Sequence, residues 1–143
     1  MTNVPARKRQ DTDLLVLMKD KEIQEQVTAF VMNEKILPKK WRLAIGLDLI
    51  KKADELVDNL TYANSIKIEN QETKNLRLKF QKFALANCFQ LQNKLVRAEK
   101  CVETVKSEQQ MRIAGVIAHE INLITAWIKS DGVNNTKNSQ NEK

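Results

Sequence analysis

Basic side chains without acidic neighbours are the residues of this sequence whose type and spacing best suit a binding function. Residues 73–98 contain no aspartate or glutamate, and their basic side chains are Lys74, Arg77, Lys79, Lys82, Lys94 and Arg97. On a helical wheel at about 100° per residue, Lys79, Lys82 and Arg97 lie opposite the apolar residues, whereas Arg77 and Lys94 flank them. Uncompensated positive charge of this kind is suited to binding the phosphates of nucleic acid.

A second group of basic residues, Lys39, Lys40 and Arg42, lies at the start of the preceding helical pattern. Acidic residues partly offset its charge farther along that pattern. The whole chain has a formal charge of +6 and a pI near 9.4, which favours an anionic partner. Residues 1–12 add a basic cluster, for which two interpretations remain: an unstructured solubilising end, or an arm that reaches the anionic partner.

Residues that perform catalysis or bind metals form no recognisable constellation. His119 and Glu120 resemble half of a zinc-protease motif, but Leu123 stands where that motif needs its second histidine. The three glycines are too widely separated to form a phosphate-binding loop. We therefore expect a protein that is not an enzyme and has no metal site or cofactor.

The two cysteines, Cys88 and Cys101, lie in one predicted helix. Thirteen residues of helix separate their α-carbons by about 20 Å, which is too far for a disulfide. We expect reduced thiols within the core and a cytoplasmic protein. No apolar run reaches the length of a membrane span, so no membrane partner is expected.

Apolar residues recur at helical spacing in four segments, over residues 13–35, 39–63, 73–103 and 107–129. Asp13 is the expected cap of the first, and Ser107 with Gln110 has the form of a capping box for the fourth. Short connections between amphipathic helices predict an all-α, antiparallel up-down-up-down four-helix bundle. Residues 1–12 are predicted to be a flexible basic arm, 13–130 the bundle, and 131–143 a disordered polar tail.

The second helical segment is apolar over more than half of its circumference, which suggests contact with more than one neighbour. The candidates for an interface between subunits are Trp41, Ile45, Leu49 and, on the next helix, Phe89. On the wheel, Phe89 lies toward the polar side, where it either stacks on a base or is buried against another subunit. Gly46 either marks a close helix contact or is simply tolerated.

Two short motifs resemble a known family. The sequence LPKKWR at residues 37–42 resembles the entry to the second helix in a family of small bacterial four-helix-bundle proteins, and residues 121–131, INLITAWIKSD, resemble the end of its last helix. The resemblance covers residues 14–131. The family includes proteins encoded in intervening sequences of ribosomal RNA genes and the accessory variability determinants of diversity-generating retroelements.

The resemblance implies a ring of five four-helix bundles that binds RNA and a reverse transcriptase during RNA-templated cDNA synthesis. No catalytic residue carries over, and Pro38, Lys39 and Arg42 carry over only as the helix-entry motif. This chain departs from the family in its modest charge excess. Two functions therefore remain: a nucleic-acid-binding accessory protein that contacts RNA or DNA and a reverse transcriptase, or a structural or protein-interaction bundle such as an intervening-sequence protein.

Overall fold

The chain folds as an all-α four-helix bundle, as predicted. The computed structural model describes the backbone of residues 6–141 and the side chains of residues 12–132. Within this part of the chain the long helices are α1 (Ala6–Met32), α2 (Leu47–Ser65), α3 (Gln71–Cys101) and α4 (Ser107–Asn141). Before α2, a 3-10 turn, η1 (Lys39–Trp41), leads into a π-helical turn, η2 (Arg42–Gly46).

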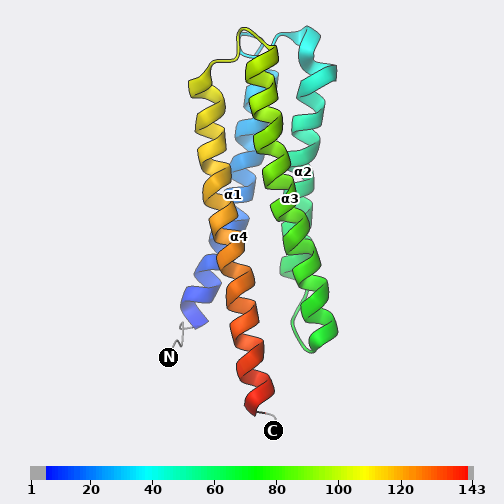
Figure 1. Ribbon diagram of the computed structural model, residues 1–143, viewed down its shortest axis with the longest axis vertical. Helices are drawn as coiled ribbons and strands as arrows, with labels where there is room; N and C mark the ends of the chain where they lie inside the picture. Colours follow the sequence, from blue (N-terminus) through cyan, green and yellow to red (C-terminus); the bar gives the residue numbers. More distant parts are fainter. Residues whose placement is uncertain (1–5, 142–143) are drawn as a thin grey trace.

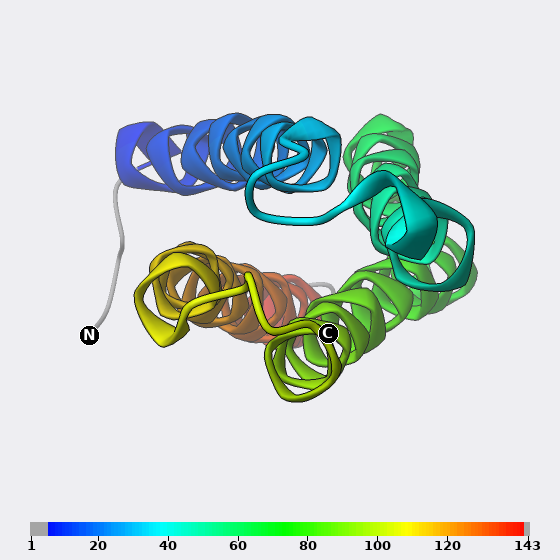
Figure 2. The same cartoon turned by 90° about the horizontal axis from the view of Figure 1, so that it is seen from above.

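Each helix packs against the helices next to it in the chain, and α1 also packs against α4, which closes the bundle. Figure 1 shows the connections between helices at alternate ends of the molecule. Seen from above, the four helices enclose a common interior (Figure 2). Short connections of this kind place consecutive helices side by side. None of the helices within residues 6–141 has the length and apolar character needed to span a membrane.

The core consists of apolar residues that recur every three or four positions on all four helices. On α3 the buried residues of this series are Ala84, Cys88, Leu91, Leu95 and Ala98, as the periodicity predicts. On α2 they are Leu49, Ala53, Leu56, Leu60 and Ala63. Trp127 on α4 is one of the largest fully buried side chains. Burial of these side chains is the main favourable contribution to folding, at about 25 cal/mol per Å² of apolar surface.

Two of the apolar faces differ in part from those that the helical spacing predicts. On α1 the spacing predicts a stripe of Leu14, Leu15, Leu17 or Met18, Val27, Phe30 and Val31. Val27, Phe30 and Val31 are buried, together with Val16 and Ile23, whereas Leu14, Leu15 and Met18 are exposed. Before and within α2, the predicted main stripe includes Leu43 and Leu47, and both are exposed. Two apolar stripes compete in each segment, and the packing of neighbouring helices decides which of them is buried.

The helix ends also differ from the prediction. Helix α1 begins at Ala6 rather than Asp13, and α4 continues to Asn141 rather than ending near Lys129. Much of the predicted arm and tail is therefore helical; residues 1–5 and 142–143 lie outside the described residues. The capping box occurs at α3, where Asn70 Oδ1 accepts a hydrogen bond from the backbone N–H of Thr73 at 2.9 Å. Ser107 does not form the predicted one, because its hydroxyl donates to Glu99.

Gly46 marks a close contact between η2 and the end of α1. A Cβ atom at this position would lie 2.7 Å from Val31 Cγ1 and 3.2 Å from Leu37 Cδ2. Both neighbours are fully buried, so neither has space to move away. The absence of a side chain at Gly46 lets the chain pass the end of α1 as it enters α2.

Candidate nucleic-acid interface

The outward face of α3 carries exposed basic residues along much of its length. We define the outer α3 surface by its exposed side chains: Asn75, Lys79, Lys82, Ala86, Phe89, Gln90, Asn93, Val96, Arg97 and Lys100. Among the described side chains, Lys79, Lys82 and Arg97 form no ion pair, and the outer α3 surface has no acid between Asn75 and Lys100. Glu72, in the first turn of α3, is exposed on the same face seven residues before Lys79. Glu99, on the same helix, accepts hydrogen bonds from Ser107 and Gln110 at the start of α4. The surface therefore presents an excess of positive charge, with an exposed acid at the beginning of the helix.

Arg77 belongs to the interior of the bundle and not to this surface. Its Nε atom lies 3.0 Å from Asp131 Oδ2 on α4, and its Nη1 donates to the backbone oxygen of Ile66 at 3.3 Å. The guanidinium also lies over the ring of Trp127, 4.7 Å from its centroid. Only 13% of its side chain is exposed. Arg77 is thus a structural link between α3 and α4 and is not available to a phosphate.

Lys94 is also neutralised, by an ion pair with Asp48 on α2. The hydrogen bond from Lys94 is the main reason why the pKa of Asp48 is lowered. This pair is one end of a seam of polar contacts between α2 and α3. Farther along the seam, Asn59 Nδ2 donates to Asn87 Oδ1 at 2.7 Å, and Asn87 Nδ2 donates to Glu55 Oε2 at 3.2 Å.

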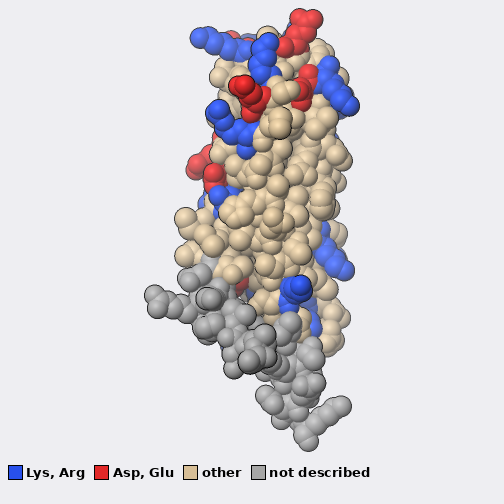
Figure 3. Space-filling view, turned by 60° about the vertical axis from the view of Figure 1, so that its left-hand side comes forward, with Lys and Arg blue, Asp and Glu red and all other residues tan. Residues whose placement is uncertain are grey.

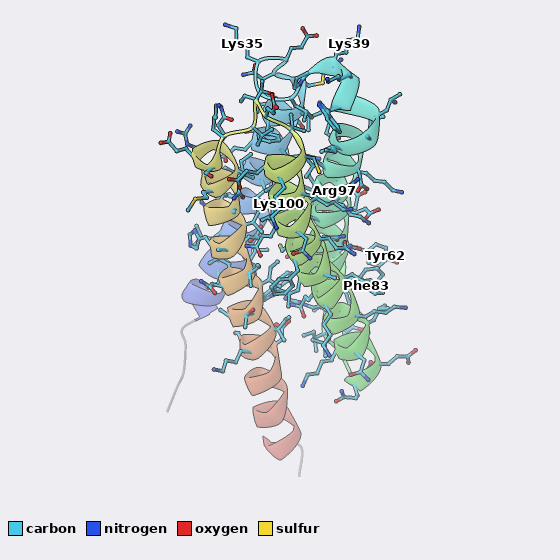
Figure 4. All side chains as sticks on the ribbon, turned by 45° about the horizontal axis from the view of Figure 1, so that its top comes forward. Lys35, Lys39, Tyr62, Phe83, Arg97 and Lys100 are labelled. Carbon is cyan, nitrogen blue, oxygen red and sulfur yellow. The ribbon has the colours of Figure 1, made fainter. Side chains whose placement is uncertain are left out.

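The other predicted basic residues lie toward the two ends of the bundle. Lys39 and Lys40 are exposed on η1, whereas Arg42 is half-buried, with a nitrogen 3.8 Å from Glu34 Oε1. Lys74 is half-buried near the beginning of α3; burial raises the pKa of Asp131, and the charge of Lys74 is the smallest of the effects that oppose this rise. Figure 4 shows Lys39 and Lys35 at one end of the molecule, with Arg97 and Lys100 on the part of α3 nearer that end. The structure therefore brings together part of the predicted set.

An aromatic cluster lies beside the basic residues at the lower end of the α2–α3 seam. Tyr62 and Phe80 have ring centroids 4.2 Å apart, and Phe80 meets Phe83 edge to face at 6.0 Å. Tyr62 is 53% exposed and Phe83 46% exposed. Figure 4 shows these two side chains close together on the outside of α2 and α3. The three-and-four spacing of the apolar residues allows either Phe83 or Ala84 on the buried face of α3; the structure buries Ala84 and leaves Phe83 exposed.

Lys79 and Lys82 flank the Phe83 ring. The ammonium of Lys79 lies 5.8 Å from the ring centroid, within the range of a cation–π contact. The surface pocket here has a volume of about 330 Å³, at the lower end of the size range of small-molecule sites. It is lined by Asn75, Leu78, Lys79, Lys82 and Phe83.

Two of the four candidates for a subunit interface are core residues. Ile45 is 4% exposed and Leu49 is fully buried, so neither can contact another subunit. Trp41 is half-buried and lines a second pocket, of about 350 Å³, with Cys101 and Thr104. Phe89 is 51% exposed on the outer α3 surface. Of the four, Phe89 is the one with a large apolar surface available for contact.

The side of the bundle formed by α1 and α4 is different in character. Figure 3 shows that its middle carries few charged side chains. Between Arg112 and Lys129, the exposed residues of α4 are uncharged, and α1 exposes Leu14, Leu15 and Met18. Among the described surfaces, this one is a poor match for an anionic ligand.

Two carboxyl groups are buried in the interior, Asp20 on α1 and Glu120 on α4. The charged cluster of residues 19–22 interrupts the apolar pattern of the sequence, which predicts that it faces solvent; for Asp20 that prediction is wrong. Burial raises the pKa of Asp20 to about 7 and that of Glu120 to about 9, with the Asp20 carboxylate adding to the effect on Glu120. Within the described residues, none of the four carboxyl oxygens has a hydrogen-bond partner. A neutral carboxyl is the form that such surroundings favour.

These carboxyls lie near Cys88, whose thiol pKa is raised by burial and, secondarily, by Glu120 and Asp20. Both cysteines are free; Cys88 is buried, but Cys101 is exposed, which corrects its predicted place in the core. His119 is exposed, apart from this cluster. Within residues 12–132, no three histidine, cysteine, aspartate or glutamate residues are arranged to hold a metal ion.

Sequence reasoning missed Tyr62, Phe83 and Lys100 as parts of the exposed site. Lys100 lies just beyond the acid-free stretch, after Glu99, and on the same helical face as Lys79 and Lys82. The three-and-four spacing that places Ala84 in the core also permits Phe83, so spacing alone does not separate them. Tyr62 joins the site only because α2 packs beside α3.

Comparisons with models of protein families, with curated proteins and with solved structures found no match to this chain.

Proposed function

We propose that this protein is a non-catalytic nucleic-acid-binding subunit that contacts RNA or single-stranded DNA through the outer α3 surface. The observation that carries the proposal is the set of exposed basic residues, Lys79, Lys82, Arg97 and Lys100, on a helix face that has no acid between them. Each phosphate that a lysine or arginine neutralises releases counterions, which favours binding at low salt. The basic residues are spread along one long helix, as suits contact with a long polyanion.

Reversal of charge on this surface tests the proposal. We expect Lys79→Glu/Lys82→Glu/Arg97→Glu to weaken binding of a labelled RNA strand and to reduce the salt dependence of its affinity. Loss of three phosphate contacts to a single strand lowers the slope of log K against log salt by about 2. Fluorescence anisotropy over a series of salt concentrations measures both quantities.

A matched control reverses three exposed charges elsewhere, Lys21→Glu/Arg112→Glu/Lys129→Glu on α1 and α4. This control changes the net charge by the same amount as the α3 variant. If the nucleic acid contacts α3 itself, the control should weaken binding far less than the α3 substitutions do. Equal loss in both variants would indicate a general effect of charge. An affinity and salt slope unchanged by the α3 substitutions would favour the alternative, a structural or protein-interaction bundle.

By the family resemblance, we extend the proposal to a role as a partner of a retroelement reverse transcriptase in RNA-templated cDNA synthesis. The extension rests on the motifs at residues 37–42 and 121–131. A reverse-transcriptase gene with template and variable repeats beside the gene for this chain would support it. A gene inside a ribosomal RNA operon would favour the intervening-sequence branch.

The same resemblance implies a homo-oligomer. The apolar side chains that support subunit contact are Phe89 on α3 and Leu14, Leu15 and Met18 on α1, all of which are exposed. Apolar residues of this size are often buried at interfaces. The mass in solution, by light scattering, tests this point, and a monomer at micromolar concentration would exclude a stable ring.

A further inference from the structure

We propose that Tyr62 and Phe83 form a stacking subsite for an unpaired nucleobase, so that the preferred ligand of the outer α3 surface is a single strand. The inference rests on the proposed function and specifies its ligand. It concerns the lower half of α3, where the aromatic cluster meets Lys79 and Lys82.

The exposed rings are held in place from below. Phe80 is half-buried and contacts both Tyr62, at a centroid distance of 4.2 Å and an interplanar angle of 32°, and Phe83, at 6.0 Å and 81°. Each outer ring therefore rests on a ring anchored in the α2–α3 interface. A ring that is already fixed loses little conformational freedom when a base stacks on it.

The charges around the rings suit a phosphodiester chain. Lys79 and Lys82 line the pocket of about 330 Å³ that Phe83 helps to form, and Asn75 adds an amide to it. The Asn75 Oδ1 atom accepts a hydrogen bond from Gln71 at 2.9 Å, which leaves its amide hydrogens for the edge of a base. A base on the ring would place its phosphates within reach of the two lysines.

Two acids of the adjacent seam are paired with lysines, and a third, Asp58, bears on the path of such a strand. Glu55 is paired with Lys52, with 3.1 Å between Nζ and Oε2, and Asp48 is paired with Lys94. Asp58 is exposed one turn before Tyr62 on α2. Its charge would repel phosphates from α2, so the strand is expected to follow α3 toward Arg97.

A double helix cannot use this subsite, since its bases are paired and stacked on one another. Single strands offer free bases, and proteins bind them by combining a basic surface with exposed aromatic rings. The basic residues alone would accept either ligand. The aromatic cluster is therefore the feature that discriminates between them.

The test compares three labelled probes: an oligouridylate, an abasic ribose-phosphate strand of equal length, and an RNA duplex. We expect Phe83→Leu and Tyr62→Leu each to weaken binding of the oligouridylate about fivefold, the lower end of what base stacking contributes. The salt slope and the affinity for the abasic strand should stay unchanged, because the lysines remain. An oligothymidylate probe determines whether the strand may be DNA as well as RNA.

Met111→Ala is the control, because Met111 is an exposed apolar side chain, 63% against 46% for Phe83, that lies on α4 outside the outer α3 surface. It should leave binding unchanged, and circular dichroism should show all variants folded. The inference is overturned if wild type binds the abasic strand or the duplex as tightly as the oligouridylate, or if Met111→Ala matches the loss in Phe83→Leu. These results leave the phosphate contacts of the proposed function intact; that function fails if wild type binds no probe or if reversing the charges of Lys79, Lys82 and Arg97 leaves affinity and salt slope unchanged.

Discussion

The guanidinium of Arg77 and the carboxylate of Asp131 form an ion pair across the α3–α4 interface, with 3.0 Å between Nε and Oδ2. Gln81 donates a hydrogen bond to the same carboxylate oxygen, also at 3.0 Å. Burial raises the pKa of Asp131, while Arg77 and Gln81 lower it, so the two effects oppose each other. The network sets the register of α3 against α4 through charged groups that are largely shielded from solvent.

We expect Asp131→Ala to lower the free energy of unfolding by about 2 kcal/mol, because it leaves the shielded Arg77 and Gln81 without their shared acceptor. Urea unfolding monitored by circular dichroism measures the change. Asp58→Ala, at an exposed position on α2, is the control and should alter stability by less than about 0.5 kcal/mol. Equal stability of Asp131→Ala and wild type would show that the pair contributes little.

The buried carboxyls Asp20 and Glu120 should make the bundle less stable as the pH rises. Their folded-state pKa values, about 7 and about 9, lie above the ordinary values of 3.8 and 4.5. The folded chain therefore binds more protons than the unfolded chain between these limits. Its free energy of unfolding should fall as the pH increases from about 4 to about 9, by at most about 1.4 kcal/mol per pH unit for each group.

The variant Asp20→Asn/Glu120→Gln removes this titration and should reduce the slope. The neighbours that influence the pair, Lys19, Lys21 and Cys88, remain in place. His119→Gln is the control, because His119 is exposed and adjacent to Glu120 in the chain. Urea unfolding at several pH values measures how the free energy of unfolding changes with pH. An equal change in wild type and the double variant would contradict the prediction.

Two glycines should respond in opposite ways to the same substitution. Gly46→Ala introduces a methyl group 2.7 Å from Val31 Cγ1 and should cost about 1–3 kcal/mol by overpacking. Gly115→Ala meets no atom within 4 Å in α4 and should gain up to about 1 kcal/mol from higher helix propensity. Thermal unfolding should therefore give a melting temperature below the wild-type value for Gly46→Ala and above it for Gly115→Ala. A stabilising effect of Gly46→Ala would show that η2 can shift to accept the methyl group.

The two thiols should differ in reactivity. Cys101 is exposed, whereas Cys88 is buried with a raised thiol pKa, and the thiolate is the reactive form. Iodoacetamide should therefore modify Cys101 in the folded protein and Cys88 only after denaturation, as peptide mass spectrometry can show. Modification of Cys88 at the same rate under native conditions would indicate that the core opens readily.

Local periodicity was enough to predict the helical architecture. The core residues Ala84, Cys88, Leu91, Leu95 and Ala98 follow the three-and-four spacing of a buried helix face and are buried. Helical wheels depend only on the chain itself, so they also placed Lys79, Lys82 and Arg97 opposite the core. These features of α3 required no knowledge of its neighbours.

Features that depend on two helices at once were decided only by the tertiary structure. Arg77 is held inside because Asp131 and Trp127 on α4 receive its guanidinium, and Asp20 is buried because α1 turns it toward Glu120. Tyr62 lies beside Phe83 because α2 and α3 run side by side. The sequence by itself determined which residues share a helix face. The tertiary structure decided which polar residues are buried and which aromatic rings lie together on the surface, because the residues that contact them are far away along the chain.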